Sequence, residues 1–335
     1  MRNRELEARI VAHPEDDESW SVYADWLESH GDPRGEVLAI AMRAEKARDP
    51  KLELIANARL IRHAPQLCGG LVETFRVGSV GLPEGVGWRR GFANALRFDP
   101  GTVTRPLAEA VRAAFAEEAC AFVTDVVIRN SLEAIDGAIL ALAEAAPASV
   151  REVVLSSGAN IADVTPLFAL ANLVRLRCTA NDDGDGHTPL SALVAHAAAP
   201  WPLRILDVKP RATPETAAAL ARLFARADVP LTDVTIAIGG GILVRVPQVE
   251  REAREQFAST VCRAIVASPL AHQIQRLYLH LPFSRDDYQQ FVKHVGRFTS
   301  LHSIVLPSRT FTKKLEVATI AQRDAYNAML RARHR

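Results

Sequence analysis

The second two thirds of this sequence repeat one short pattern, apolar-x-x-apolar-x-apolar. Seven copies read VTDVVI, VREVVL, LVRLRC, LRILDV, LTDVTI, IQRLYL and LHSIVL, and they begin at Val123, Val150, Leu173, Leu203, Leu231, Ile274 and Leu301. A looser copy, ANALRF, begins at Ala93. Successive copies start 23 to 43 residues apart. A period of this size is typical of repeat architectures, in which one supersecondary unit recurs along the chain.

Each repeat combines a strand with a helix. The fourth and sixth positions are two residues apart, so they lie on one face of a strand, and the third and fifth lie on the other. Between the runs, AIDGAILALAEAAP is apolar at helical spacing, and TPETAAALARLFARA has Thr213 as its expected N-cap. SRDDYQQFVKHVG has Ser284 three residues before Asp287 and ends at Gly296. The pattern predicts an α/β protein.

This unit resembles the leucine-rich repeat family, in the longer form typified by ribonuclease inhibitor, over about residues 93–310. The resemblance implies an open solenoid with parallel strands on a concave face and helices on a convex face. The Asn or Cys that the family has three residues after the last apolar position is present only as Asn181, so we expect a degenerate solenoid. The long interval after Leu231 contains an insertion at about 239–255, and its Gly239–Gly241 run suggests a flexible excursion.

A closed (β/α)₈ barrel is the alternative architecture. Barrel strands are buried on both faces and are apolar throughout. Burying an ion costs on the order of several kcal/mol, which favours the open solenoid. The charged outward residues are Asp125, Glu152, Arg175, Arg177, Asp207, Asp233 and Arg276. A barrel enzyme would have its active site at the strand carboxyl ends, near Asn130, Ser156, Thr179, Lys209 and His280.

Residues 1–65 are predicted to be helical. Trp20, Tyr23, Trp26 and Leu27 share one helix face, Gly31 ends that helix, and Pro33 suits the start of the next. The stretch YADWLESHGDPRGE (23–36), which follows PEDDE, resembles a short bacterial module called the repeat-companion domain. That module accompanies leucine-rich repeats, and it implies a cap or docking module without a known activity.

The same stretch has the residue types of an acid pair, Asp25 and Asp32, with His30 between them in the sequence. We favour a structural role, in which Asp25 pairs with Arg34 across the turn and the aromatic side chains form a small core. The predicted organisation is then a helical domain (1–65), a connecting segment (66–92), the repeats (93–310) and a C-terminal capping helix (311–335). Apolar residues of the capping helix recur at helical spacing at Leu315, Ala318, Ala325 and Met329.

Composition limits the partners. A net charge of +1 gives no general attraction to nucleic acid or to an anionic membrane, and there is neither a signal-peptide pattern nor an uninterrupted apolar run of membrane-spanning length. The widely spaced cysteines, Cys68, Cys120, Cys178 and Cys262, predict buried thiols in a reducing compartment. We expect a cytoplasmic monomer.

The segments that resemble metal- or cofactor-binding motifs each lack a residue that the motif requires. NDDGDGH (181–187) resembles the start of a calcium loop, but Ala192 occupies the position that requires a bidentate Glu. Gly239–Gly241 is not followed by a phosphate-binding Lys, and the ten histidines show no metal-ligand spacing. The sequence has no GxSxG motif. We therefore predict no catalytic residue, metal or cofactor.

The outward strand positions are the predicted binding surface, because solenoids grip other proteins with that face. We expect Arg175 to pair with Glu152 and Arg177 with Asp207, and Val127 and Val154 to supply apolar contact. The candidate partner-binding residues are Arg129, Arg175, Arg177, Asp207, Lys209, Arg276, Tyr278 and His280. The predicted function is a non-enzymatic scaffold that binds a cytoplasmic protein. The alternative is a regulator of a small GTPase or another nucleotide-binding protein, with Arg129 acting in trans.

Overall fold

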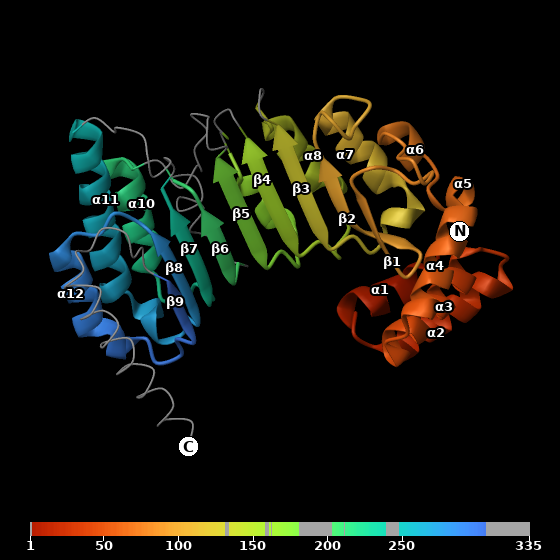
Figure 1. Ribbon diagram of the computed structural model, residues 1–335, viewed down its shortest axis with the longest axis horizontal. Helices are drawn as coiled ribbons and strands as arrows, with labels where there is room; N and C mark the ends of the chain where they lie inside the picture. The colour runs from red at the N-terminus through yellow and green to blue at the C-terminus, as the bar shows by residue number, and fades with distance from the viewer. Residues whose placement is uncertain are drawn as a thin grey trace, which may run out of the picture. The chain divides into compact units, whose positions relative to one another are not determined.

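The computed structural model describes residues 2–130, 134–157, 161, 163–180, 203–210, 212–238 and 248–305. The chain divides into two compact units, Met1–Lys209 and Pro210–Arg335. Both units combine helices with mostly parallel strands, so the α/β prediction is confirmed (Figure 1). The predicted calcium-like segment 181–187, the glycine run 239–241 and the capping helix 311–335 lie outside the described residues.

The first unit begins with helices and continues as a strand–helix repeat. Its strands β1–β6 follow one another in chain order; β1 is antiparallel to β2, and the pairs from β2 to β6 are parallel. The strands are β1 (Val86–Arg89), β2 (Phe92–Phe98), β3 (Asp125–Asn130), β4 (Glu152–Ser157), β5 (Arg175–Ala180) and β6 (Ile205–Val208). The helices are α1 (Arg4–Ala12), α2 (Asp17–Ser29), α3 (Arg34–Ala47), α4 (Pro50–Arg62), α5 (Ala64–Leu67), α6 (Leu71–Thr74), α7 (Leu107–Ala116) and α8 (Asp136–Ala145), with 3₁₀ turns at Glu118–Cys120 and Thr165–Ala169.

The second unit repeats the same alternation. Its strands are mutually parallel and in chain order: β7 (Asp233–Ala237), β8 (Arg276–His280) and β9 (Ser303–Val305). Its helices are α10 (Pro214–Phe224), α11 (Gln248–Ala267) and α12 (Arg285–His294), with 3₁₀ turns at Pro269–His272 and Val295–Arg297. Residues 248–255 of the predicted insertion form the first turns of α11. None of the described helices is long and apolar enough to cross a membrane.

The helix ends follow the sequence signals. Thr213 accepts a hydrogen bond from the amide of Thr216 at the start of α10. Ser284 and Asp287 form a reciprocal capping box at the start of α12, which satisfies two backbone amides that the helix itself leaves unpaired.

Apolar ridges hold the strands together. In the first unit the fourth-position residues are neighbours in register, and so are the sixth-position residues, and all are at most 1% exposed. The two rows are Leu96, Val126, Val153, Leu176 and Leu206, then Phe98, Ile128, Leu155, Cys178 and Val208. Helices α7 and α8 lie on one face of β2–β4 (Figure 1). The alternation predicted from the sequence is confirmed within each unit, since Val234, Ile236, Leu277 and Leu279 are also buried.

The same pair of backbone hydrogen bonds recurs where successive strands begin. The carbonyl at the second position of a run accepts two amides from the next run: Thr124 O accepts from the amides of Arg151 and Glu152 at 2.9 and 3.0 Å. The Arg151 carbonyl receives the amides of Val174 and Arg175 in the same way, at 2.8 and 3.0 Å. In the second unit Thr232, and then Gln275, repeat the arrangement.

Polar side chains just before some runs add a second tie. Ser149 Oγ donates to the carbonyls of Ala121 and Val123, at 3.2 and 2.9 Å. Asn172 Nδ2 donates to the Ala148 carbonyl at 2.7 Å, and Gln273 donates to the carbonyl of Val229. Each bond joins one repeat to the loop of the preceding repeat, so these side chains satisfy part of the turn backbone.

Substitutions at two adjacent residues of β4 should distinguish its buried face from its outward face. Val153 is fully buried and Val154 is half-buried on the other face. We expect Val153→Ala to lower the free energy of unfolding by about 2 kcal/mol, because it removes buried methyl groups and leaves a cavity. Val154→Ala should cost about 0.5 kcal/mol. Urea unfolding of the two variants measures both values, and equal losses would contradict the assignment of faces.

Gly35 permits the close contact of α2 and α3. A Cβ at this position would lie 2.6 Å from Glu28 Cγ and 2.8 Å from Ala24 O. Gly35→Ala should therefore destabilise the protein by about 1–3 kcal/mol through overpacking, although alanine is the better helix former. The control is Gly137→Ala in α8, where the nearest atom to a Cβ, in Ala108, is 3.8 Å away. That variant should be neutral or gain up to about 1 kcal/mol, and a stabilising Gly35→Ala would refute the packing argument.

Candidate functional site

The aromatic residues of helix α2 pack against the start of the strand–helix repeats. Trp20 and Tyr23 of α2 are buried against Phe92 of β2 and Phe122, with ring centroids 4.8 Å apart for Trp20–Phe122 and 5.8 Å for Tyr23–Phe92. Trp26 stacks on Tyr23 with centroids 5.9 Å apart. The aromatic core predicted for this stretch is therefore present, and it extends into the first strands.

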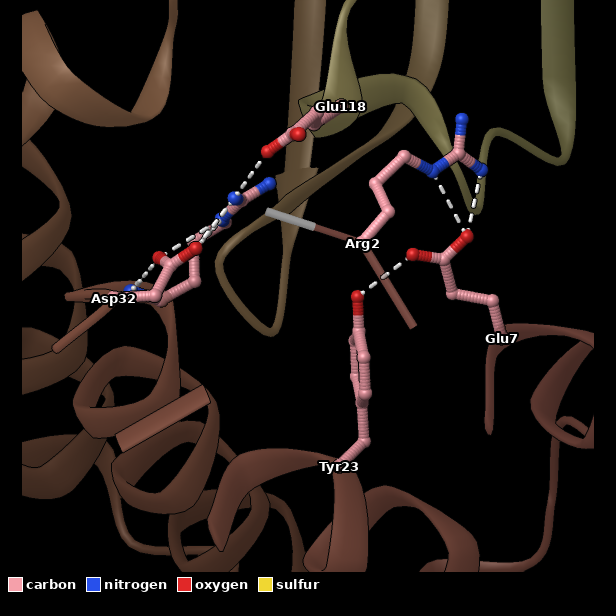
Figure 2. Close-up of polar contacts among 6 residues, drawn as sticks. Arg2, Glu7, Tyr23, Asp32 and Glu118 are labelled. Atoms are coloured by element: carbon pink, nitrogen blue, oxygen red, sulfur yellow. Dashed lines mark hydrogen bonds and ion pairs between the residues drawn. The ribbon is translucent and has the colours of Figure 1, made fainter. Parts of the chain in front are cut away.

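The acidic residues of the stretch have partners different from those predicted. Arg34 does not pair with Asp25. Its guanidinium bonds Asp32, with Nε–Oδ1 at 2.9 Å, and reaches Glu118 Oε2 at 2.8 Å (Figure 2). Asp25 is exposed and lines a groove between α2 and α3. Asp32 is favoured because it lies in the turn, where its Oδ1 also accepts the Arg34 amide at 2.9 Å, whereas Asp25 lies further back on α2 and lines the groove.

Asp32 is held as a carboxylate. Burial alone raises its pKa, but hydrogen bonds from the Arg34 side chain and amide outweigh burial and bring the pKa below its ordinary value. A second network lies beside it: Glu7, 5% exposed, accepts from Tyr23 Oη at 3.0 Å and from Arg2 Nη2 at 2.6 Å (Figure 2). Burial, then the Glu7 charge, raises the pKa of Tyr23, so its hydroxyl stays protonated.

The β1–β2 turn is attached to the same helices. Gly31, Arg90 and Gly91 have positive φ, and Arg90 and Gly91 form the tight turn of the hairpin. Arg90 pairs with Glu45 at 2.6 Å and Asp17 at 3.2 Å, and its guanidinium lies 5.1 Å from the Trp20 ring centroid. Arg34 and Arg90 thus both have carboxylate partners and the rings of Trp20, Tyr23, Phe92 and Phe122 are packed together, an arrangement that joins the helices to the first strands.

The outward strand face of the first unit is the candidate site. We use the term strand face 1 for the outward residues of β2–β6, which are those at the third, fifth and seventh positions counted from the start of each run. Its central apolar pair is Val127 and Val154, which are neighbours in register and half-buried. Arg97 is in register with Val127 on the other side, and Arg129 lies two residues further along β3. Both arginines are exposed, and no described residue forms an ion pair with either.

The ion pairs expected across strand face 1 are present. Arg175 Nη1 lies 3.2 Å from Glu152 Oε2, and Arg177 Nε lies 2.7 Å from Asp207 Oδ2. Their side chains are 18–37% exposed. Pairs with this exposure contribute about 0–1 kcal/mol, so they fix the charge pattern of the face more than its stability. Lys209, next to β6, is half-buried.

The second unit has a smaller outward face, strand face 2, made by the corresponding positions of β7–β9. Arg276 Nε lies 3.3 Å from Asp233 Oδ1 while its side chain is 65% exposed. Tyr278 Oη lies 3.3 Å from Ser303 Oγ, and His280 is exposed at the end of β8. The predicted site residues are thus divided between two faces, five on the first and three on the second.

Sequence reasoning missed Arg97 as a site residue. It occupies the fifth position of ANALRF, the looser copy of the repeat, so applying the outward-position rule to that copy would have found it.

The thiols and cavities of the described residues offer little chemistry. All four cysteines are buried and free, as predicted, and burial raises the pKa of Cys68 to about 11 and those of the other three to about 12. Thiols in such surroundings are poor nucleophiles. A cleft of about 70 Å³ beside Trp20 and Phe122 is far smaller than ordinary ligand pockets of about 300–1,000 Å³, and the groove between α2 and α3, about 310 Å³, is at the lower end of that range. The described residues include no cluster of three His, Cys, Asp or Glu side chains suited to a metal.

Comparisons with protein-family models, with curated proteins and with solved structures found no match.

The Arg34 junction predicts a pH-dependent stability. Because the folded-state pKa of Asp32 is depressed, its contribution is complete above the ordinary carboxyl pKa of about 4 and is lost as the pH falls through the folded value. Arg34→Met should cost about 3 kcal/mol at pH 7, since it leaves Asp32 largely buried without its cation. The difference from wild type should shrink as the pH falls below about 4.

Thermal unfolding between neutral and acidic pH measures this difference. The control is Arg112→Met, which breaks a pair with Glu144 whose side chains are about half exposed and should cost under about 1 kcal/mol. A pH-independent difference for Arg34→Met would contradict the proposed role of the ion pair.

Proposed function

We propose that this chain is a degenerate leucine-rich-repeat solenoid that acts as a non-enzymatic scaffold and binds a protein partner through its outward strand positions. The observation that carries the proposal is the composition of strand face 1. Val127 and Val154 form an apolar centre, and the exposed Arg97 and Arg129 lie beside it without a described carboxylate partner. Arginine next to a partly apolar centre is the composition of interface hot spots.

The ion pairs on the face support an open sheet over a barrel. In a barrel the third and fifth positions would point into the closed interior or under the helix layer, where ions are costly. The side chains of Arg175 and Arg177 are instead 32% and 37% exposed. An open solenoid keeps such residues in water, available to a partner.

A protein partner also fits the absence of a reactive group among the described face residues. Two of its arginines pair with carboxylates, Arg175 with Glu152 and Arg177 with Asp207, and the thiol of Cys178 points into the core with a raised pKa. Such a surface can bind, and it has no nucleophile with an adjacent base.

The test is a binding measurement with two sets of surface variants. The full chain serves as bait in lysate of its host, and each captured protein is then purified and its Kd measured. Arg97→Glu with Arg129→Glu should weaken binding at least about 10-fold if strand face 1 is the interface, because two hot-spot residues each contribute over about 1 kcal/mol. Tyr278→Ala with His280→Ala tests strand face 2.

The matched control is Arg112→Glu on helix α7, an exposed arginine on the helix layer. Loss of affinity in either face set and not in the control supports the proposal and identifies the face. Equal Kd values for wild type and both sets would refute it.

Regulation of a GTPase is the second candidate, because Arg129 is an exposed arginine without a described ion pair. An arginine supplied in trans accelerates GTP hydrolysis about 10³–10⁵-fold. If the captured partner is a GTPase, single-turnover hydrolysis with wild type and with Arg129→Ala distinguishes this role from simple binding.

A further inference from the structure

Helix α4 has an exposed apolar face that the proposed function does not use. Leu54 is 69% exposed, Ile61 42% and Ile55 47%, and they are among the most exposed large apolar side chains of the described residues. The opposite side of the same helix is core: Ala56 and Leu60 are 6% and 5% exposed. Helix α4 therefore packs on its neighbours with one face and presents a second apolar face to water.

The exposed residues are aligned. Leu54, Ala58 and Ile61 are spaced i, i+4 and i+7, so they form one stripe along the helix, and all three are exposed. A single exposed leucine is ordinary on a protein surface. Aligned apolar residues backed by a folded module are typical of a groove or ridge that pairs with another helix.

Charge on the two edges of the stripe is unequal. At 100° per residue, Lys51 and Arg62 lie along one edge, and Glu53 and Asn57 lie along the other. Both cations are exposed, and no described carboxylate pairs with them. By contrast Arg59, nearer the core side, pairs with Glu36 at 3.2 Å. A partner complementary to this surface has an apolar stripe with acidic residues beside it.

The polar residues beside the stripe distinguish the occupants. A membrane-binding helix needs a broad continuous apolar face, whereas Lys51 and Arg62 separate this stripe from the exposed Ile55, and Glu53 and Asn57 flank its other side. An antiparallel pair with a second copy would place Lys51 and Arg62 of one chain against the same edge of the other, which is repulsive, and a parallel pair would offer the two cations a single carboxylate, Glu53. An amphipathic helix with acidic residues beside its apolar stripe can cover the apolar residues of α4 and pair with Lys51 and Arg62.

We propose that the exposed face of α4 is a docking site for an amphipathic helix of another protein, whose apolar stripe packs on Leu54, Ala58 and Ile61 and whose acidic residues meet Lys51 and Arg62. The site is independent of strand faces 1 and 2. The N-terminal helices then have two functions, since α2 and α3 join the first repeat and α4 recruits a partner.

The probes are two synthetic helical peptides of about 18 residues, or five turns. Both have leucines at i, i+4, i+7 and i+11; one has glutamates along one edge of the stripe, to meet Lys51 and Arg62, and the other has lysines at the same positions. Fluorescence anisotropy with the full chain at about 50 mM salt, where surface charges are weakly screened, gives the affinities. We expect the acidic peptide to bind at least 10-fold more tightly than the basic one.

Variants locate the site. Leu54→Ser with Ile61→Ser should abolish measurable binding, and Lys51→Glu with Arg62→Glu should reverse the preference toward the basic peptide. The control, Leu140→Ser, removes a leucine that is 47% exposed on α8 and should change nothing. Because the altered side chains are exposed, circular dichroism should show all variants folded.

Three results would overturn the proposal. Equal affinity for the two peptides, or binding unaffected by the serine pair, would show that α4 is not the site. A dimer in light scattering that the serine pair dissociates would assign the face to a second copy. Binding to phosphatidylserine vesicles that the serine pair abolishes would assign it to lipid.

Discussion

The register of the apolar ridges is the constraint on which the other features depend. Val126, Val153, Leu176 and Leu206 are neighbours in register and fully buried. The residues before and after each of them along its strand must therefore face outward. The same register brings Glu152 beside Arg175 and Arg177 beside Asp207. A shift of one residue would bury those charges and expose the ridge. The two-amide contacts to Thr124 and Arg151 carbonyls fix the register where the strands begin.

The N-terminal helices cover the end of this stack. A repeat at the end of an array lacks one neighbour, so its apolar edge needs a cap. Here Trp20 and Tyr23 pack on Phe92 and Phe122, and Arg34 ties the helical turn to Glu118. In the motif that looks most like an active site, Asp32 and Arg34 are paired and the rings are packed, which is the arrangement that a cap requires. Helix α4 lies outside this joint, and its exposed side is free to serve another purpose.

Much of this could be predicted from the sequence, because period and alternation are local properties. The strands, the outward residues and the capping box at Ser284 all follow from spacing. The pairing of Arg34 could not, since Asp25 and Asp32 are both near it in sequence and the choice depends on a turn conformation and on Glu118, far along the chain. The ties from Ser149, Asn172 and Gln273 were also missed, because their position before the run belongs to no family signature. The exposed stripe of α4 required knowing which helix face is buried.

The most direct test of the account is the accessibility of two adjacent positions on β4. The four native thiols are buried with raised pKa values, so they give little background. Val154→Cys should react with a maleimide much faster than Val153→Cys, which should be protected, because only the former lies on the outward face. Protection of both positions would mean that the face is covered, as in a closed barrel, and would contradict an open binding surface.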